Sequence, residues 1–298
     1  MDIKSIVMGM AFAFMWSSAF TSARMIVVDA PPLMSLSLRF LVSGILGVGI
    51  ALALGQTWRL TRGQWRATVV FGICQNALYL GLNFVAMQKI EAGLASIIAS
   101  SLPLMVAFAG WMFLGERTRP LGLAGLAAGM LGVLLIMGSR LSGGVDIGGL
   151  ALCLLGAMAL TVATLSVRGA SSGGNLLMVV GLQMFVGSIC LALVSAATET
   201  YEVQWSLRLV LAFAYTTLVP GLIATLVWFM LVDRIGAVRA ATFHFLNPFL
   251  GVTIAALLLG ETLGWIDLLG VAIITAGIAA VQISKAARVG AASPGIGK

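Results

Sequence analysis

Long, nearly uninterrupted runs of apolar residues fill most of the 298-residue chain, and short clusters of Gly, Pro and charged residues separate them. A helix needs about 20 apolar residues to cross the hydrocarbon core of a bilayer, whereas a barrel strand has about ten residues and alternates apolar with polar positions. Because these runs are long and do not alternate, they predict an all-α polytopic membrane protein with ten transmembrane helices. The predicted helices cover residues 4–28, 33–54, 66–87, 92–114, 121–139, 148–168, 174–196, 206–231, 236–259 and 264–284.

The composition points to the same class. Hydrophobic residues make up 60% of the chain, charged residues make up 9%, and the mean hydropathy is +1.10. Soluble domains carry about 25% charged residues, so this chain has too few to cover a surface that faces water. The three cysteines fall in apolar runs, with no CxxC motif and no cysteine–histidine pair, so we expect no metal site, no cofactor and no disulfide framework.

The net charge of +7 does not indicate a nucleic-acid partner, because Lys and Arg accumulate in the cytoplasmic loops of membrane proteins. With a cytoplasmic N-terminus, twelve of the 17 Lys and Arg residues lie on the cytoplasmic side, four lie on the opposite side, and Arg39 lies within a crossing. Both termini are therefore predicted to be cytoplasmic. Residues 285–298 are predicted to form a short disordered cytoplasmic tail.

The sequence repeats itself at a constant offset of 145 residues. The matched features are prolines, Gly-Glu pairs and glycines: Pro103 with Pro248, Gly115-Glu116 with Gly260-Glu261, Gly125 with Gly270, and Gly132 with Gly277. The offset spans five predicted crossings, an odd number, so the second copy is inserted upside down. Residues 1–145 and 146–284 are thus predicted to be two inverted five-helix repeats, an architecture that exposes a site at the bilayer midplane to alternate sides.

These features together resemble a known family. The two prolines, the two Gly-Glu pairs and Trp16-Ser17-Ser18 in the first predicted helix are similar to the EamA family of the drug/metabolite transporter superfamily. The resemblance covers nearly the whole chain, and it is greatest to the YddG-type bacterial amino-acid exporters. It implies an inner-membrane carrier, in contact with the lipid bilayer, that exports amino acids or related metabolites.

The predicted helices at 121–139 and 264–284 are rich in small residues, which let helix backbones approach closely. The residues concerned are Gly122, Gly125, Gly129, Gly132, Gly270, Ala276 and Gly277. They favour packing inside the bundle, with a dimer face as the alternative, so both a monomer and a homodimer stay open.

Polar side chains are costly in hydrocarbon, so they should face a cavity or a neighbouring helix. Asn76, Tyr79 and Asn83 recur at helical spacing on one face of 66–87. The repeat offset maps them to Gly221, Ala224 and Trp228, a combination that would suit a zwitterion with an apolar side chain. Further stripes contain Ser17, Thr21 and Arg24; Ser96, Ser100 and Pro103; and Thr161, Thr164 and Arg168. Hydrogen bonding between helices is the alternative for each stripe.

The only histidine of the chain, His244, lies in the apolar run 236–259 together with Asn247 and Pro248. His244 and Asn247 share a helix face, and Pro248 removes one backbone donor and crowds the carbonyl of His244. An unpaired acceptor at this depth is tolerated where water, a neighbour or a ligand reaches it. We interpret the cluster as the wall of a substrate cavity; the alternative is a packed histidine beside a kink.

The sequence therefore predicts one substrate site and no catalytic residues. The predicted substrate-binding residues are Trp16, Ser17, Asn76, Tyr79, Asn83, Ser100, Trp228, His244 and Asn247, and the predicted conformational residues are Pro103, Pro220 and Pro248.

The ten acidic residues all fall at predicted helix ends or in loops. A carboxylate proton relay or a sodium site normally needs an acid inside the membrane, so we expect facilitated diffusion, or proton coupling through His244. Arg24 and Arg39 fall in the outer thirds of their helices, where each could meet a substrate carboxylate. For Arg39, the favoured expectation is a side chain that reaches the interface or pairs with an acid in a loop.

Other functional classes fit less well. The chain has no HExxH, GxSxG or Walker motif, which argues against an enzyme. It has no charged or carbonyl-rich filter motif, which argues against a channel. The sequence thus predicts a secondary transporter that exports small amphipathic metabolites, most of all amino acids; a drug or nucleotide-type carrier of the same superfamily is the main alternative.

Overall fold

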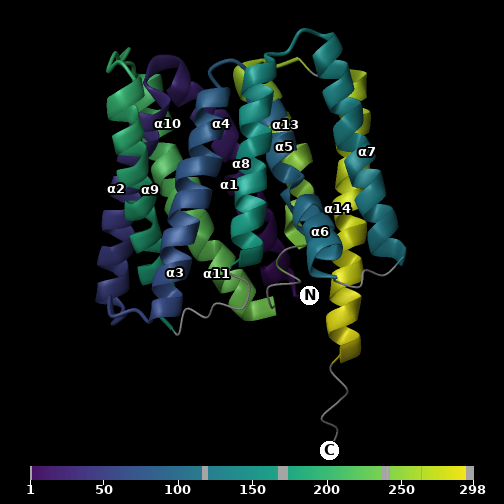
Figure 1. Ribbon diagram of the computed structural model, residues 1–298, viewed down its shortest axis with the longest axis horizontal. Helices are drawn as coiled ribbons and strands as arrows, with labels where there is room; N and C mark the ends of the chain where they lie inside the picture. Colours follow the sequence, from purple (N-terminus) through teal and green to yellow (C-terminus); the bar gives the residue numbers. More distant parts are fainter. Residues whose placement is uncertain are drawn as a thin grey trace, which may run out of the picture. The chain divides into compact units, whose positions relative to one another are not determined.

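The computed structural model describes residues 2–115, 120–166, 174–235, 240, 242–262 and 264–292 (Figure 1). These residues form helices and connecting segments, without a strand among them. Nine of the described helices are long and apolar enough to cross a membrane, and a shorter apolar helix covers Phe243–Leu259. The predicted all-α membrane fold is therefore confirmed, and the shorter helix occupies the place of the ninth predicted crossing.

The α-helices are α1 (Ile3–Asp29), α2 (Pro32–Ala53), α3 (Arg62–Phe71), α4 (Gly81–Ala86), α5 (Ala92–Ser100), α6 (Leu102–Leu114), α7 (Pro120–Ser142), α8 (Ile147–Ser166), α9 (Leu176–Thr198), α10 (Leu207–Leu218), α11 (Ala224–Ile235), α13 (Asn247–Leu259) and α14 (Trp265–Ala292). Two π-helical segments, η1 (Gly72–Leu80) and η2 (Val219–Ile223), and one 3-10 segment, η3 (Thr242–Leu246), continue these helices. The prediction of a disordered tail from residue 285 is wrong, because α14 remains helical to Ala292; residues 293–298 lie outside the described part.

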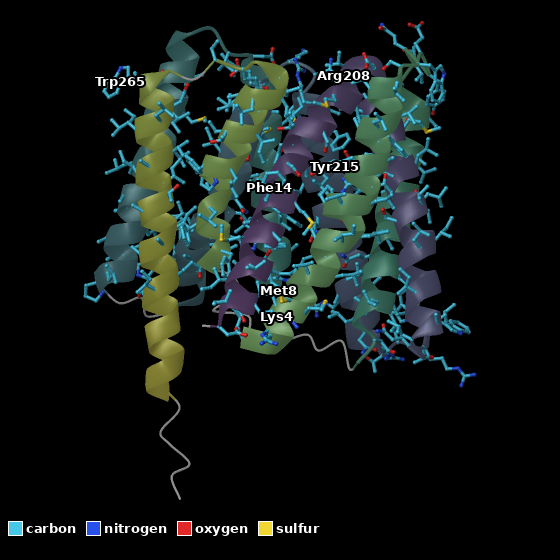
Figure 2. All side chains as sticks on the ribbon, turned by 180° about the vertical axis from the view of Figure 1, so that it is seen from behind. Lys4, Met8, Phe14, Arg208, Tyr215 and Trp265 are labelled. Atoms are coloured by element: carbon cyan, nitrogen blue, oxygen red, sulfur yellow. The ribbon has the colours of Figure 1, made fainter. Side chains whose placement is uncertain are left out.

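Large apolar side chains on the helices are exposed, as the face that meets lipid requires. Phe14 is 50% exposed and Trp265 is 71% exposed; Figure 2 labels both. In water this exposure would be unfavourable, whereas lipid tails solvate such side chains.

The helices of the two predicted repeats are interrupted at matching places. Helices α6 and α13 have 13 residues each, begin with a proline in the first turn, and end at glycines with positive φ, 62° at Gly115 and 69° at Gly260. Proline suits the first turn of a helix, where its missing N–H leaves no bond unmade. Pro103 and Pro248 therefore lie where one helical segment passes into the next, inside the apolar spans Ala92–Phe113 and Phe243–Leu259.

The chain forms two compact units. Unit 1 comprises Met1–Ser18, Ser96–Gly144 and Ala224–Lys298, and unit 2 comprises Ala19–Ala95 and Val145–Ile223. Each unit combines segments from both predicted repeats. The division of the sequence at residues 145 and 146 concerns internal similarity and stays a prediction.

In unit 1, α7 packs along α14 through their glycines (Figure 1). A Cβ atom added at Gly277 would lie 2.6 Å from the backbone oxygen of Gly125 and 2.6 Å from the backbone nitrogen of Gly129. A Cβ atom added at Gly132 would lie 3.0 Å from the backbone oxygen of Gly270. The packing interpretation of these small residues is confirmed.

In unit 2, α2 packs along α9, and Glu199 at the end of α9 caps the start of α2. The backbone N–H groups of Leu33 and Met34 donate to the Glu199 carboxylate over 2.7 and 2.9 Å, and the Ser195 hydroxyl donates to it over 2.6 Å. A carboxylate at a helix N-terminus satisfies unpaired donors and complements the helix dipole. This cap fixes the helix that carries Arg39.

Candidate functional site

Three aromatic side chains and His244 gather in unit 1. We call Phe12, Trp16, Trp228 and His244 the aromatic–histidine cluster. The His244 ring lies 5.3 Å from the Phe12 ring and 5.2 Å from the Trp228 ring, measured between centroids, and the Trp16 ring lies 6.3 Å away at 87° to the imidazole plane. Phe12 is 2% exposed, whereas the other three are half-buried. The cluster thus surrounds a partly exposed histidine with aromatic rings.

Asn247 links this cluster to the start of α13. Its amide nitrogen lies 2.9 Å from Nδ1 of His244. Because that nitrogen only donates, Nδ1 accepts, and a neutral imidazole then carries its proton on Nε2. The backbone oxygen of Asn247 accepts from the Ser17 hydroxyl over 3.4 Å.

The side-chain oxygen of Asn247 is buried and has no hydrogen-bond partner within the described part of the chain. Most buried polar atoms in proteins have a partner, and leaving one unpaired is costly. Sequence reasoning predicted Trp16, Ser17, Trp228, His244 and Asn247, and the structure brings all five together. It missed Phe12, which lies one turn before Trp16 and carries no polar signal.

The predicted stripe of η1 and α4, in unit 2, has a different environment. The Asn76 amide donates to the backbone oxygen of Gln183 over 2.9 Å, and the Asn83 amide donates to the backbone oxygen of Tyr79 over 2.7 Å. The Cys153 thiol donates to the side-chain oxygen of Asn83 over 3.2 Å. These three stripe residues are at most 4% exposed. They occupy helix–helix interfaces and hydrogen bond within the protein.

The remaining predicted residues lie at helix ends or within single helices. The Ser100 hydroxyl donates to the backbone oxygen of Ser96 over 2.7 Å within its own helix. Ser96 itself is buried against Gly251, where an added Cβ atom would lie 1.8 Å from the Ser96 hydroxyl. Pro220 is buried in η2. Thr161 and Thr164 bond to carbonyls of their own helix, and Arg168 lies outside the described residues.

Arg39 differs most from expectation. The structure shows no pair of Arg39 with an acid among the described residues: Arg39 is 7% exposed, and its Nε atom has no hydrogen-bond partner there. The approach of Arg39 to the interface stays a prediction. Arg24, by contrast, donates through Nη1 to the backbone oxygen of Met87. The sequence signal for Arg39 was its position as a charged residue inside the apolar run 33–54.

An open pocket of about 450 Å³ lies in unit 2, at the end of α1 and in the segment after α9. Its lining comprises Val27, Val28, Asp29, Ala30, Pro31, Gln88, Thr200, Glu202, Val203 and Gln204. These residues lie at helix ends, and the predicted site residues are not among them. The pocket therefore does not coincide with either polar region described above.

Comparisons with known proteins agree with this architecture. A solved crystal structure has a similar fold, with a TM-score of 0.67 and 19% sequence identity over 94% of this chain and 97% of the other. The protein named "Uncharacterized transporter YvbV" of Bacillus subtilis is 26% identical over 93% of this chain and 91% of its own length. The protein named "Uncharacterized inner membrane transporter YedA" of Escherichia coli is 28% identical over 92% of this chain and 89% of its own length.

The model of the EamA-like transporter family matches the sequence twice, over residues 3–138 and 147–282. Those two segments include almost all of the helices described above. The chain is a multi-pass membrane protein that belongs to the EamA-like transporter family.

Proposed function

We propose that this protein is a secondary carrier, and not an enzyme, that exports small amphipathic metabolites across a bacterial inner membrane by alternating access. The proposed substrates are amino acids, including those with aromatic or other hydrophobic side chains, as in the YddG-type exporters that the sequence resembles. Both termini are proposed to be cytoplasmic.

One observation carries this proposal: the buried amide oxygen of Asn247, which has no hydrogen-bond partner among the described residues, lies beside the aromatic–histidine cluster. An ammonium group can donate to such an oxygen, and aromatic faces attract cations. The rings of Phe12, Trp16 and Trp228 offer apolar surface for a hydrophobic side chain. The combination suits a molecule with an ammonium group and an apolar part.

The direct test is transport by the purified protein in liposomes. Vesicles loaded with one unlabelled amino acid should take up the same labelled amino acid in a saturable way, with counterflow, and the aromatic and large aliphatic amino acids should give the highest rates. A screen in which only drugs or nucleotides show saturable flux would contradict the proposed substrate class. Ion currents without counterflow would identify a channel instead.

A further inference from the structure

Arg39 is a charged residue in an apolar setting. It lies in α2, within the candidate membrane span Pro32–Ala53, and is 7% exposed. Arginine stays protonated in proteins, and a desolvated cation is costly unless it is paired. Its Nε atom lacks a partner in the part of the chain that the structure describes. A cation retained in these surroundings suggests a functional role.

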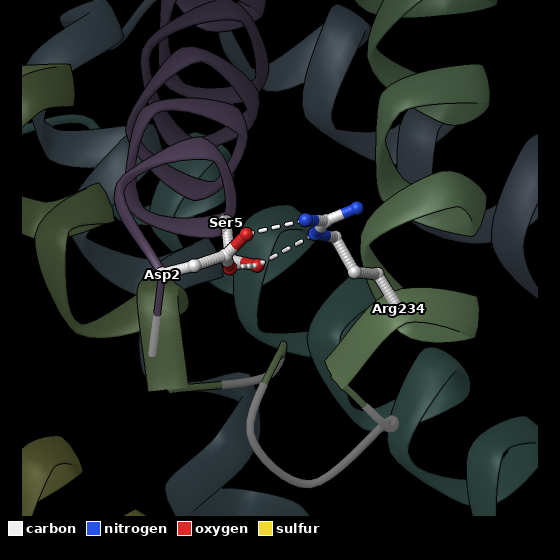
Figure 3. Close-up of polar contacts among 3 residues, drawn as sticks. All are labelled: Asp2, Ser5 and Arg234. Carbon is white, nitrogen blue, oxygen red and sulfur yellow. Dashed lines mark hydrogen bonds and ion pairs between the residues drawn. The ribbon is translucent and has the colours of Figure 1, made fainter.

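Two other arginines show how structural arginines are satisfied in this protein. Arg24, which is half-buried, donates to the backbone oxygen of Met87. Arg234 pairs with the Asp2 carboxylate and donates through Nε to the Ser5 hydroxyl over 3.2 Å (Figure 3). Arg39, the most buried of the three, has its guanidinium carbon 5.3 Å from the centroid of the Phe40 ring, but its Nε atom has no hydrogen-bond partner within the described residues.

A glycine, Gly221, faces the guanidinium of Arg39. A Cβ atom added at Gly221, in η2, would lie 3.6 Å from Nη2 of Arg39 and 3.4 Å from the Ser43 hydroxyl. The Ser43 hydroxyl is 3.5 Å from the backbone oxygen of Thr217, a long contact that can be exchanged for a better acceptor. Residue 221 therefore adds no side-chain atom of its own beside the guanidinium and the hydroxyl.

We infer that Arg39 forms a carboxylate-binding site within unit 2, which the transported molecule occupies independently of the aromatic–histidine cluster of unit 1. The Nε and Nη2 atoms form one edge of the guanidinium, and such an edge donates two parallel hydrogen bonds to a carboxylate. Ser43 adds a third donor beside that edge. The Glu199 cap on α2 and the π-helical segment η2 hold the two sides of the site, and π-helical segments frequently occur at functional sites.

This inference rests on the proposed function and adds a requirement to it. The substrate must carry a carboxylate, so an amino acid should be recognised and its amide, which has the same side chain and ammonium group, should not. A carboxylate is also the partner that offsets the cost of the buried charge.

The test compares Arg39→Met, Arg39→Gln and Arg39→Lys with Arg24→Met as a control of the same residue type in the same unit. Counterflow of a labelled amino acid is competed with the same amino acid or with its amide. The wild-type protein should be inhibited at least tenfold better by the acid than by the amide, because a charge-assisted hydrogen bond contributes about that factor. Arg39→Gln and Arg39→Met should lose this preference, and Arg24→Met should keep it.

Thermal unfolding separates binding from a structural role. Arg39→Met should melt at the wild-type temperature or above it, because the substitution removes a buried charge whose Nε atom has no hydrogen-bond partner among the described residues. A lower melting temperature that Arg39→Lys restores would assign Arg39 a structural role and overturn the inference. Unchanged preference for the acid in Arg39→Gln would also overturn it.

The experiments also distinguish failure of the proposed function from failure of the inference about Arg39. If the wild-type protein moves no amino acid, the proposed function fails, and stabilisation of the purified protein by aliphatic and aromatic monocarboxylates then decides the inference. Stabilisation that disappears in Arg39→Met supports a carboxylate site. Stabilisation by phosphatidylglycerol alone would show a lipid phosphate at Arg39 and overturn the carboxylate assignment.

Discussion

Two polar regions of this protein have nearly the same sequence signature but different environments. In η1 and α4, Asn76, Tyr79 and Asn83 recur at helical spacing; in η3 and α13, His244 and Asn247 do the same. The side-chain amides of the first region hydrogen bond to Gln183, Tyr79 and Cys153, whereas the second leaves the buried oxygen of Asn247 without a partner among the described residues.

The difference arises from the neighbouring helices. Glycines stand opposite the first region. A Cβ atom added at Gly187 would lie 2.4 Å from Cβ of Asn76, and a Cβ atom added at Gly156 would lie 3.1 Å from the backbone oxygen of Tyr79. Helices α8 and α9 therefore approach closely enough to bury the amides. The second region has aromatic rings as neighbours, which offer almost no hydrogen-bond acceptors or donors. The first region consequently contributes hydrogen bonds to the fold, whereas the second is the region that we propose as the substrate site.

The largest expected effect concerns the second region. Asn247→Ala should lower amino-acid counterflow by about tenfold or more, because it removes the partner of His244 and an acceptor that has no hydrogen-bond partner among the described residues. Phe249→Ala is the control, since Phe249 lies in the same helix and is 54% exposed. Initial rates per amount of folded protein measure the effect, and equal rates in the two variants would assign Asn247 to packing.

The next effect concerns the fit of α9 against Asn76. Gly187→Ala should destabilise the protein by about 1–3 kcal/mol, because the new methyl group forces neighbouring atoms apart. Gly49→Ala, at an exposed helical glycine of the same unit with no atom within 4 Å of the added Cβ, should cost nothing. Thermal unfolding in detergent compares them. Equal melting temperatures would mean that α9 does not pack tightly on Asn76.

A smaller effect is expected at Asn83. Asn83→Ala should cost about 1 kcal/mol of stability, since it breaks the hydrogen bonds to Tyr79 and Cys153. Transport per folded molecule should stay unchanged. A variant that keeps its melting temperature and loses transport would place Asn83 in the substrate path and remove the contrast between the two regions.

The smallest effect concerns the ion pair at the start of α1, the helix that contributes Phe12 and Trp16. The Arg234 guanidinium and the Ser5 hydroxyl hold the pKa of the Asp2 carboxyl below its ordinary value near 3.8. A lowered pKa stabilises the fold above the ordinary value, and this contribution is lost as the pH falls towards the folded-state value. The wild-type protein should therefore melt slightly above Asp2→Asn at pH 7 and at pH 5, and the gap should shrink below pH 3.8. A gap that grows on acidification would contradict the assignment.

The sequence predicted the membrane fold well, because apolar runs of bilayer length are a direct signature of spanning helices. It missed the helical continuation to Ala292, since a helix that leaves the membrane no longer needs apolar residues and the charges there resemble a loop. The π-helical segments η1 and η2 were also missed. Both segments are too short for their different number of residues per turn to alter the hydrophobic pattern.

The candidate site was predicted less completely. Residue type and spacing identified His244 and Asn247, but they identified Asn76 and Asn83 equally well, because a single sequence does not reveal which carbonyl or glycine stands opposite an amide. The same limit applies to Arg39. Its position in an apolar run was visible, whereas the lack of a partner for its Nε atom among the described residues is a property of the fold.

The most direct test of the contrast between the two regions measures flux and stability on the same preparations of Asn247→Ala and Gly187→Ala. Labelled amino-acid counterflow and the melting temperature are recorded for each protein and for the wild type. We expect Asn247→Ala to lose flux while it keeps the wild-type melting temperature. We expect Gly187→Ala to melt at a lower temperature while each folded molecule transports normally. The reverse pattern, with flux lost in Gly187→Ala and stability lost in Asn247→Ala, would contradict the assignment of the substrate site to His244 and Asn247.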